Sequence, residues 1–250
     1  MYAAHAPAIA DLIGPGYVLA WTFETSGASP EQTPRALLVS DNGTARGGVI
    51  VVSPARQLSD RGAVRLASLS NGGFVVTFGN PYRLGALSTA GFQVRDGLGA
   101  LVAAGETNLL HGDTFAVATA PVGGFAFFGV QGDDQGGARQ LRVFGADGAE
   151  RRRGSTRTSD NLERTSLVTL NGERFFVSGE EGPVNEPDGR IAGLLFENTL
   201  AQADARLIIS GPSPRARSAD SAALPDGRIV TVWADDASNI VASFLRVATS

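Results

Sequence analysis

The chain has 250 residues, 25 acidic and 21 basic side chains, a formal net charge of −4 and no cysteine. This mild charge does not favour nucleic acid or an anionic membrane as a partner, and no run of about 18 apolar residues could span a bilayer. Without cysteine the chain has no disulfide, thiol nucleophile or thiolate metal ligand. All 21 basic residues are arginine, so a Schiff-base lysine and the lysine of a phosphate-binding loop are also excluded.

One short unit recurs five times along the chain. An apolar residue leads into a turn, and five positions later a run of β-branched and aromatic residues begins. In the clearest copy, at 69–78, Asn71-Gly72-Gly73 supplies the positive φ that a tight hairpin turn needs. The second strands of the five copies open at Tyr17, Phe74, Phe125, Phe175 and Ile229, about 50 to 57 positions apart. A period of this length with a few strands in each repeat predicts a β-propeller.

Each repeat is predicted to hold up to four strands, the first nearest the axis of the ring. The first repeat (6–53) has strands at 8–13, 17–23, 35–40 and 48–53, and the second (64–103) at 64–69, 74–78, 84–89 and 98–103. The third (114–150) has them at 115–119, 125–130 and 140–144, the fourth (165–210) at 166–170, 175–178, 191–197 and 206–210, and the fifth (218–250) at 221–224, 229–233 and 240–247. No segment shows the 3.6-residue period of a helix. We predict an all-β chain forming a single domain over residues 1–250, a five-bladed propeller with four-stranded blades. The last blade lacks an outer strand, for which residues 1–6 are a candidate.

The repeat resembles a known kind of sequence. The run at 69–78 looks like the hairpin of propeller-type repeats in large secreted bacterial exoproteins and adhesins, including repeat-in-toxin proteins. The run at 224–233 resembles it too, with Trp233 at the strand-ending tryptophan, and 141–148 resembles the following strand and its Asp-Gly turn. The fourth repeat departs from the pattern, with Glu173-Arg174 where glycines are usual. The resemblance implies a binding scaffold outside the cell or on its surface, and it carries no catalytic residues.

The start of the chain has no positive region followed by an apolar segment, so we expect no cleavable secretion signal in this chain. We expect an extracellular, cell-surface or particle-associated protein, and the chain could be a segment of a larger chain or assembly. No membrane insertion is expected.

Charged side chains gather in the loops predicted to share one rim of the propeller. Loops that lead into first strands are rich in arginine, as at Arg151, Arg152 and Arg153 after the third repeat, and loops between second and third strands are rich in acids. We expect a ligand to be bound there by Arg61, His111, Asp113, Arg157, Arg164, Arg217 and Asp235. Arginine forks suit carboxylate or sulfate groups. The alternative is a solvated rim on which opposite charges pair across neighbouring loops.

These features predict a non-enzymatic recognition or adhesion module whose rim binds a surface glycan or a protein. A glycoside hydrolase is the first alternative, with Asp113, Glu163 and Asp220 as carboxylates facing the central funnel. A structural spacer domain of an adhesin or a phage-like particle is the second. No cofactor is expected. Asp133 and Asp134 could offer oxygens to Ca²⁺, but their loop lacks the spaced carboxylates of a calcium loop, which favours an acidic turn in water.

Overall fold

The computed structural model describes residues 3–26, 31–53, 56–57, 64–79, 89–110, 115–121, 123–130, 139–156, 162–181, 189–201, 206–210, 216–235 and 237–247. These residues form five antiparallel sheets that follow one another along the chain. Within that part of the chain, no helix is long and apolar enough to cross a membrane.

In each sheet the strands pair in chain order, except that β5 of the first sheet pairs with β3. The first sheet has β1 (Ala3–Asp11), β2 (Tyr17–Glu24), β3 (Glu31–Val39), β4 (Ile50–Val51) and β5 (Arg56–Gln57), and both short strands pair with β3. The second has β6 (Arg65–Ser68), β7 (Phe74–Gly79), β8 (Thr89–Arg95) and β9 (Leu101–Leu110), and the third has β10 (Ala116–Thr119), β11 (Phe125–Val130), β12 (Arg139–Phe144) and β13 (Glu150–Ser155). The fourth has β14 (Leu162–Leu170), β15 (Arg174–Glu181), β16 (Arg190–Phe196) and β17 (Leu207–Ile208), with a 3₁₀ turn at Asn171–Glu173. The fifth has β18 (Arg217–Ala223), β19 (Arg228–Ala234) and β20 (Ile240–Arg246).

The repeated hairpin forms as its sequence predicts. Gly72 has a φ of +85°, in the left-handed region that favours glycine. The Asn71 side-chain oxygen accepts a hydrogen bond from the Gly73 amide at 3.0 Å, and the Leu69 amide donates to the Gly73 carbonyl at 2.8 Å. The turn thus satisfies its own backbone groups and sets the pairing register of β6 and β7.

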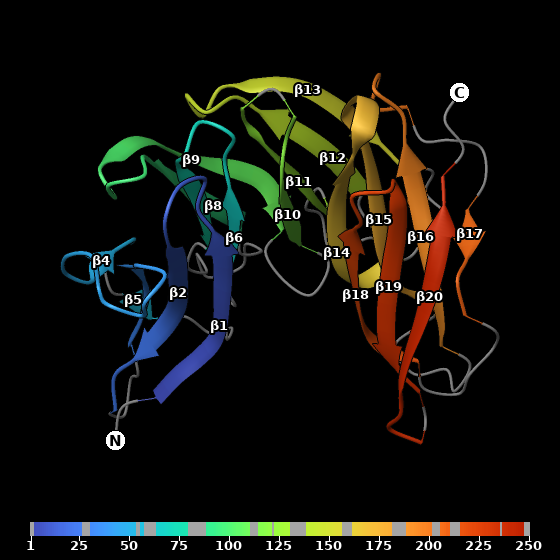
Figure 1. Ribbon diagram of the computed structural model, residues 1–250, viewed down its shortest axis with the longest axis horizontal. Helices are drawn as coiled ribbons and strands as arrows, with labels where there is room; N and C mark the ends of the chain where they lie inside the picture. Colours follow the sequence, from blue (N-terminus) through green and yellow to red (C-terminus); the bar gives the residue numbers. More distant parts are fainter. Residues whose placement is uncertain are drawn as a thin grey trace.

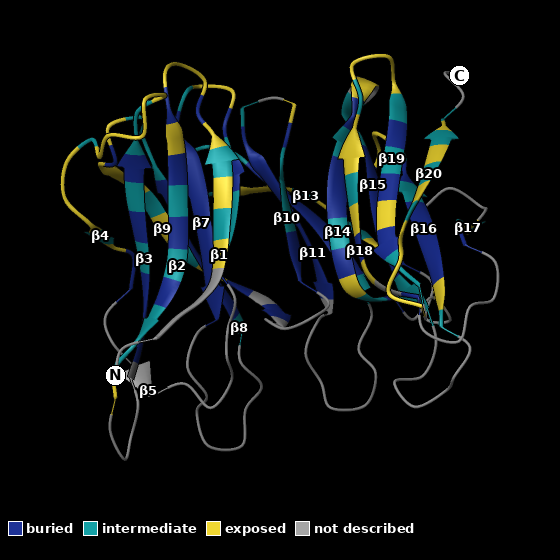
Figure 2. Cartoon of the chain, turned by 60° about the horizontal axis from the view of Figure 1, so that its bottom comes forward, coloured by how far each residue is buried: buried dark blue, intermediate teal, exposed yellow. Residues whose placement is uncertain are grey.

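The sheets fan around one axis, and the first strand of each sheet faces that axis (Figure 1). These innermost strands are β1, β6, β10, β14 and β18, and consecutive ones contact each other. Hydrophobic clusters fill the spaces between neighbouring sheets. Burial reflects this layering (Figure 2). Strand β7, in the second sheet, is buried along its whole length, whereas β2 and β19, in the first and last sheets, alternate between buried and more exposed residues.

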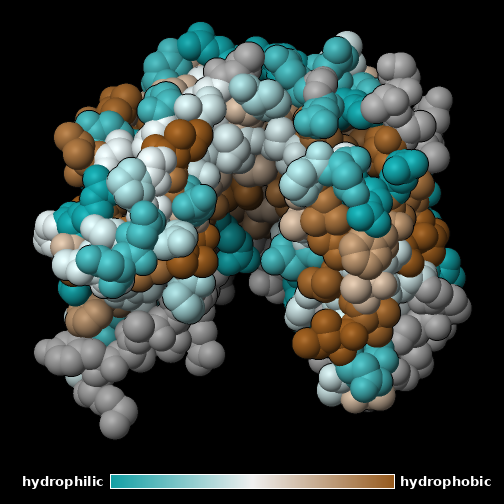
Figure 3. Space-filling model, in the orientation of Figure 1, coloured by the Kyte–Doolittle hydropathy of each residue, from teal (hydrophilic) through white to brown (hydrophobic). Residues whose placement is uncertain are grey.

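The fan is open between its first and last sheets. No hydrophobic cluster of the described residues joins these two sheets, and Figure 3 shows a wide opening between them. Ile9 on β1 is 66% exposed, and Ile240 and Phe244 on β20 are 85% and 59% exposed. Apolar faces thus border the opening on both sides.

Three strand predictions need correction. Residues 3–6, the described part of the segment 1–6, do not complete the last sheet, because Ala3–Asp11 form β1 and pair with β2. Residues 150–155, predicted as an arginine-rich loop, form β13 by pairing with β12. The predicted strand at 84–89 falls almost wholly outside the described residues, and the third strand of its sheet begins at Thr89. As predicted, the fifth sheet has three described strands.

Candidate functional site

A central cavity of about 580 Å³ lies among the innermost strands of all five sheets. The sheets therefore converge on one space, and each contributes side chains to its wall. This space lies where the sequence places the funnel of a propeller.

One layer of the cavity wall is set by strand register. The five residues of this layer are Ala8, Arg65, Ala116, Ser166 and Asp220. Each pairs with the residue three positions after the apolar residue that opens the second strand in the sequence repeat, which is Tyr17, Phe74, Phe125, Phe175 or Ile229. All five line the cavity. The layer therefore combines small side chains with a hydroxyl, a guanidinium and a carboxylate.

Bulges in three innermost strands, β1, β14 and β18, lie beside this layer, and the β1 shift falls between His5 and Ala8. The register of β14 shifts between Glu163 and Ser166, and that of β18 shifts between Arg217 and Asp220. Within the shifts, Arg164 has a φ of +46° and Ser218 a φ of +56°. Left-handed backbone is uncommon for residues other than glycine, and a bulge redirects the side chains beside it. Arg164 and Ser218 both line the cavity.

Hydrogen bonds orient the Asp220 carboxylate. Its Oδ1 accepts from the Ser166 hydroxyl at 2.7 Å and from the Ser221 amide at 2.9 Å. The Ser221 hydroxyl bonds in turn to the Ser178 hydroxyl at 2.7 Å and to the Thr231 hydroxyl at 2.8 Å. This network ties the fourth sheet to the fifth and presents one carboxylate to the cavity.

Arg164 is held by an ion pair at the same wall. Its Nη1 lies 3.1 Å and 3.0 Å from the two carboxylate oxygens of Glu180, and Glu180 Oε1 also accepts from the Ser218 amide at 2.5 Å. The Arg164 side chain is 44% exposed, so the ion pair contributes about 0–1 kcal/mol. At this pair the charges meet across neighbouring strands, as the alternative of a paired rim expects.

The other predicted site residues have different surroundings. Glu163 stands beside Arg164 on β14, paired in register with Glu180. Asp235 closes the turn between β19 and β20, where its carboxylate accepts from the Asn239 amide at 2.8 Å and from its side chain at 3.0 Å. These bonds, the side-chain bond first, lower the pKa of Asp235.

The structure does not describe the side chains of the remaining predicted residues. Arg61, His111, Asp113, Asp133, Asp134 and Arg157 lie outside the described residues, as does the side chain of Arg217. Their roles, and the approach of Asp113, Glu163 and Asp220 to one another, stay predictions. Among the described residues, no three histidines, aspartates or glutamates gather into a group that could hold a metal ion.

Arg65, Ser166 and Ser221 contribute to the wall and were not predicted. A signal for the layer exists in the sequence, because each of its members stands four residues before the apolar residue that leads into the hairpin, as Arg65 does before Leu69. Applying this four-residue offset to all five repeats identifies the five residues of the layer from the sequence.

Comparisons with known proteins locate the fold. No family model and no curated protein matches the chain. The β-propeller domain of the trilobed protease from Pyrococcus furiosus, described as having an open velcro topology, matches with a TM-score of 0.52 at 10% identity over 98% of this chain and 69% of that one. The chain has a β-propeller fold. Two further propeller matches are the Aleuria aurantia lectin in complex with α-methyl-L-fucoside (TM-score 0.57, 9% identity, 96% of this chain and 90% of that one) and an endo-arabinase from Bacteroides thetaiotaomicron (TM-score 0.51, 9% identity, 98% and 94%).

Proposed function

We propose that the chain is a five-bladed β-propeller, open between its first and last blades, that binds a cell-surface glycan in its central cavity. The observation that carries the proposal is the polar wall formed by Asp220, Ser166, Ser218 and Arg65 at the axis. Two of the strands that form this wall, β14 and β18, have bulges beside Ser166 and Asp220. Strained backbone conformations cluster at functional sites.

The chemistry of the wall suits sugar hydroxyls. The Asp220 carboxylate can accept hydrogen bonds from hydroxyl groups, while serine hydroxyls and arginine guanidiniums donate them. The cavity volume of about 580 Å³ lies in the usual range for small-molecule sites. A sugar as ligand also agrees with the fucoside held by the Aleuria aurantia lectin.

The second candidate function is glycoside hydrolysis, which the match to the endo-arabinase favours. A glycosidase needs two carboxyl groups about 5–9.5 Å apart. Asp220 is the only carboxylate among the described residues that line the cavity, and this favours binding over hydrolysis. The resemblance to adhesin repeats supports a location outside the cell, where a surface glycan or a surface protein would be met.

A glycan array tests the proposal, with the wild type beside Asp220→Asn and Asp147→Asn. We expect wild-type binding to a defined set of glycans and a loss of about tenfold or more in Asp220→Asn. Asp147→Asn, which changes an exposed acid in the turn between β12 and β13, is the control and should bind as the wild type does. Thermal melts check that each variant is folded.

Two results would overturn glycan binding as the function. One is silence of the wild type across the array and on whole cells. The other is release of reducing sugar from glycan substrates that is lost in Asp220→Asn, which would establish the hydrolase instead.

A further inference from the structure

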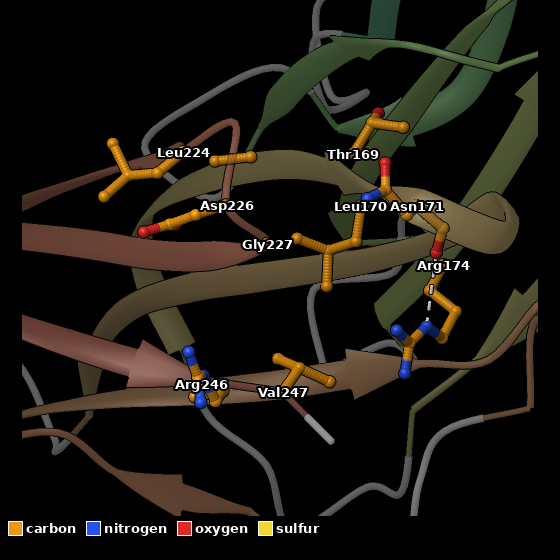
Figure 4. A pocket seen from close by; sticks show the side chains of 10 residues that line it. Thr169, Leu170, Asn171, Arg174, Leu224, Asp226, Gly227, Arg246 and Val247 are labelled. Atoms are coloured by element: carbon orange, nitrogen blue, oxygen red, sulfur yellow. Dashed lines mark hydrogen bonds between the residues drawn. The ribbon is translucent and has the colours of Figure 1, made fainter. Parts of the chain in front are cut away.

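A second pocket, of about 380 Å³, lies between the fourth and fifth sheets at their hairpin turns (Figure 4). Thr169, Asn171 and Arg174 line it from the fourth sheet, and Ala223, Asp226 and Arg246 line it from the fifth. The other described lining residues are Leu170, Leu224, Gly227 and Val247. No residue of this pocket also lines the central cavity.

The pocket opens where a bond between neighbouring sheets is missing. The Thr119 hydroxyl donates to the Ser68 carbonyl at 2.5 Å, and the Thr169 hydroxyl donates to the Thr119 carbonyl, so a threonine links the third sheet to the second and the fourth sheet to the third. Ala223 occupies the same register position in the fifth sheet, since it pairs with Ile229 as Thr169 pairs with Phe175. Alanine has no hydroxyl to donate, so this bond cannot form between the fifth sheet and the fourth.

Arginine also replaces glycine beside the pocket. The residue just before the second strand is Gly16, Gly73 and Gly124 in the first three sheets, where an added Cβ would stand 2.2, 2.4 and 1.8 Å from a backbone oxygen. No side chain fits at those turns. In the fourth sheet the 3₁₀ turn gives this position a different backbone, and Arg174 occupies it. Ala223 and Arg174 both line this pocket, whereas Arg228, the arginine at the corresponding position of the fifth sheet, does not.

The pocket carries an excess of positive charge. Arg174 and Arg246 line it from two sides, and its carboxylate, Asp226, already accepts from Arg228 Nε and Nη2 at 2.7 Å each. Bonds from the backbone and side chain of Arg228 lower the pKa of Asp226. Arg174 Nε donates to the Asn171 carbonyl at 3.3 Å, which orients the guanidinium.

Apolar and polar groups alternate around the pocket. Leu170 and Val247 lie between the two arginines in Figure 4, and Asn171 and Thr169 add an amide and a hydroxyl. A ligand that matches this lining has an anionic group for the guanidiniums, hydroxyls for the polar side chains and a C–H face for the apolar ones.

We propose that this pocket is a second binding site, independent of the central cavity, for a sugar that bears a carboxylate, such as a hexuronate. Arginine forks bind planar carboxylates with two parallel hydrogen bonds. The carboxylate would lie between Arg174 and Arg246, and the sugar ring would lie against Leu170 and Val247.

Isothermal titration of the whole chain with glucuronate, glucose and inorganic phosphate tests the site. We expect glucuronate to bind, and glucose and phosphate to bind at least about tenfold more weakly. Arg174→Gln and Arg246→Gln should each weaken glucuronate binding about tenfold or more, and Ala223→Thr, which restores the bond between the turns, should also weaken it. Arg151→Gln, which removes an exposed guanidinium on β13, is the matched control and should change nothing.

The outcomes separate this site from the central one. Asp220→Asn should leave glucuronate binding intact, and a loss in that variant would assign the ligand to the central cavity and overturn the proposal. Glucose binding as tight as glucuronate, phosphate binding as tight as glucuronate, or full binding by both arginine variants would overturn it as well. Thermal melts show whether Ala223→Thr is folded, and the two arginine variants decide the question if it is not.

Discussion

Replacing Phe92 by alanine tests whether the sheets pack as blades. Phe92 is 2% exposed on β8, and its ring centre lies 5.3, 5.8 and 5.5 Å from those of Phe125, Phe127 and Phe144 in the third sheet. Loss of a buried phenylalanine side chain costs about 3–5 kcal/mol. A chain of this size loses about 2–4 °C of melting temperature for each kcal/mol, so we expect a fall of about 6–20 °C.

Scanning calorimetry of the wild type and two variants measures the effect. Phe244→Ala is the matched control, because Phe244 is 59% exposed beside the opening of the fan and its loss should cost about 1 kcal/mol or less. Equal falls in melting temperature for Phe92→Ala and Phe244→Ala would refute the packing of the second sheet against the third, and with it the fan of sheets that forms the central cavity.

Four further variants test the turns and the bonds between sheets. Gly124→Ala should destabilise the chain by about 1–3 kcal/mol, because the added Cβ would meet a backbone oxygen. Gly48→Ala is the control, because the space around its added Cβ is open, and it should have the melting temperature of the wild type. Thermal melts of both variants measure the difference. Thr119→Val removes the hydroxyl that donates to the Ser68 carbonyl and should cost about 1 kcal/mol in chemical denaturation, and no change would contradict a stabilising role for that bond. The pKa of Asp235 is lower in the folded chain than its ordinary value of 3.8. The Asp235 carboxylate therefore stabilises the fold fully above pH 3.8, and this stabilisation is lost as the pH falls through the folded-state pKa. Melts from neutral to acid pH should therefore show Asp235→Ala below the wild type at neutral pH and converging with it below pH 3.8; a constant difference would contradict this reasoning.

The repeated hairpin was predictable because its causes are local. Turn chemistry at 71–73 and the apolar pattern after it specify strands without reference to the rest of the chain. The structure places the opening residues Phe74, Phe125, Phe175 and Ile229 in the core at 0% exposure. Tyr17 is the exception, at 39% exposed, because it stands in the first sheet, beside the opening of the fan.

Outer strands were harder to predict, because pairing rather than side-chain pattern forms them. Residues 150–155 are mostly charged and resemble a loop, yet they form β13 by hydrogen bonding to the edge of β12. Residues 3–6, within the segment proposed as the last strand of the fifth sheet, extend the innermost strand of the first sheet instead. Which edge a short strand joins depends on the sheets already in place.

By itself the sequence determined the repeating unit, the strand order within each sheet and the absence of thiol and lysine chemistry. Tertiary structure alone decided which side chains meet. Register and bulges brought Arg65, Ser166 and Asp220 to one cavity, and the packing of the fourth sheet against the fifth placed Arg174 and Ala223 around a second pocket. The reason is physical: a hairpin is set by neighbours in the chain, whereas a site is set by surfaces about 50 residues apart that touch only when the sheets pack.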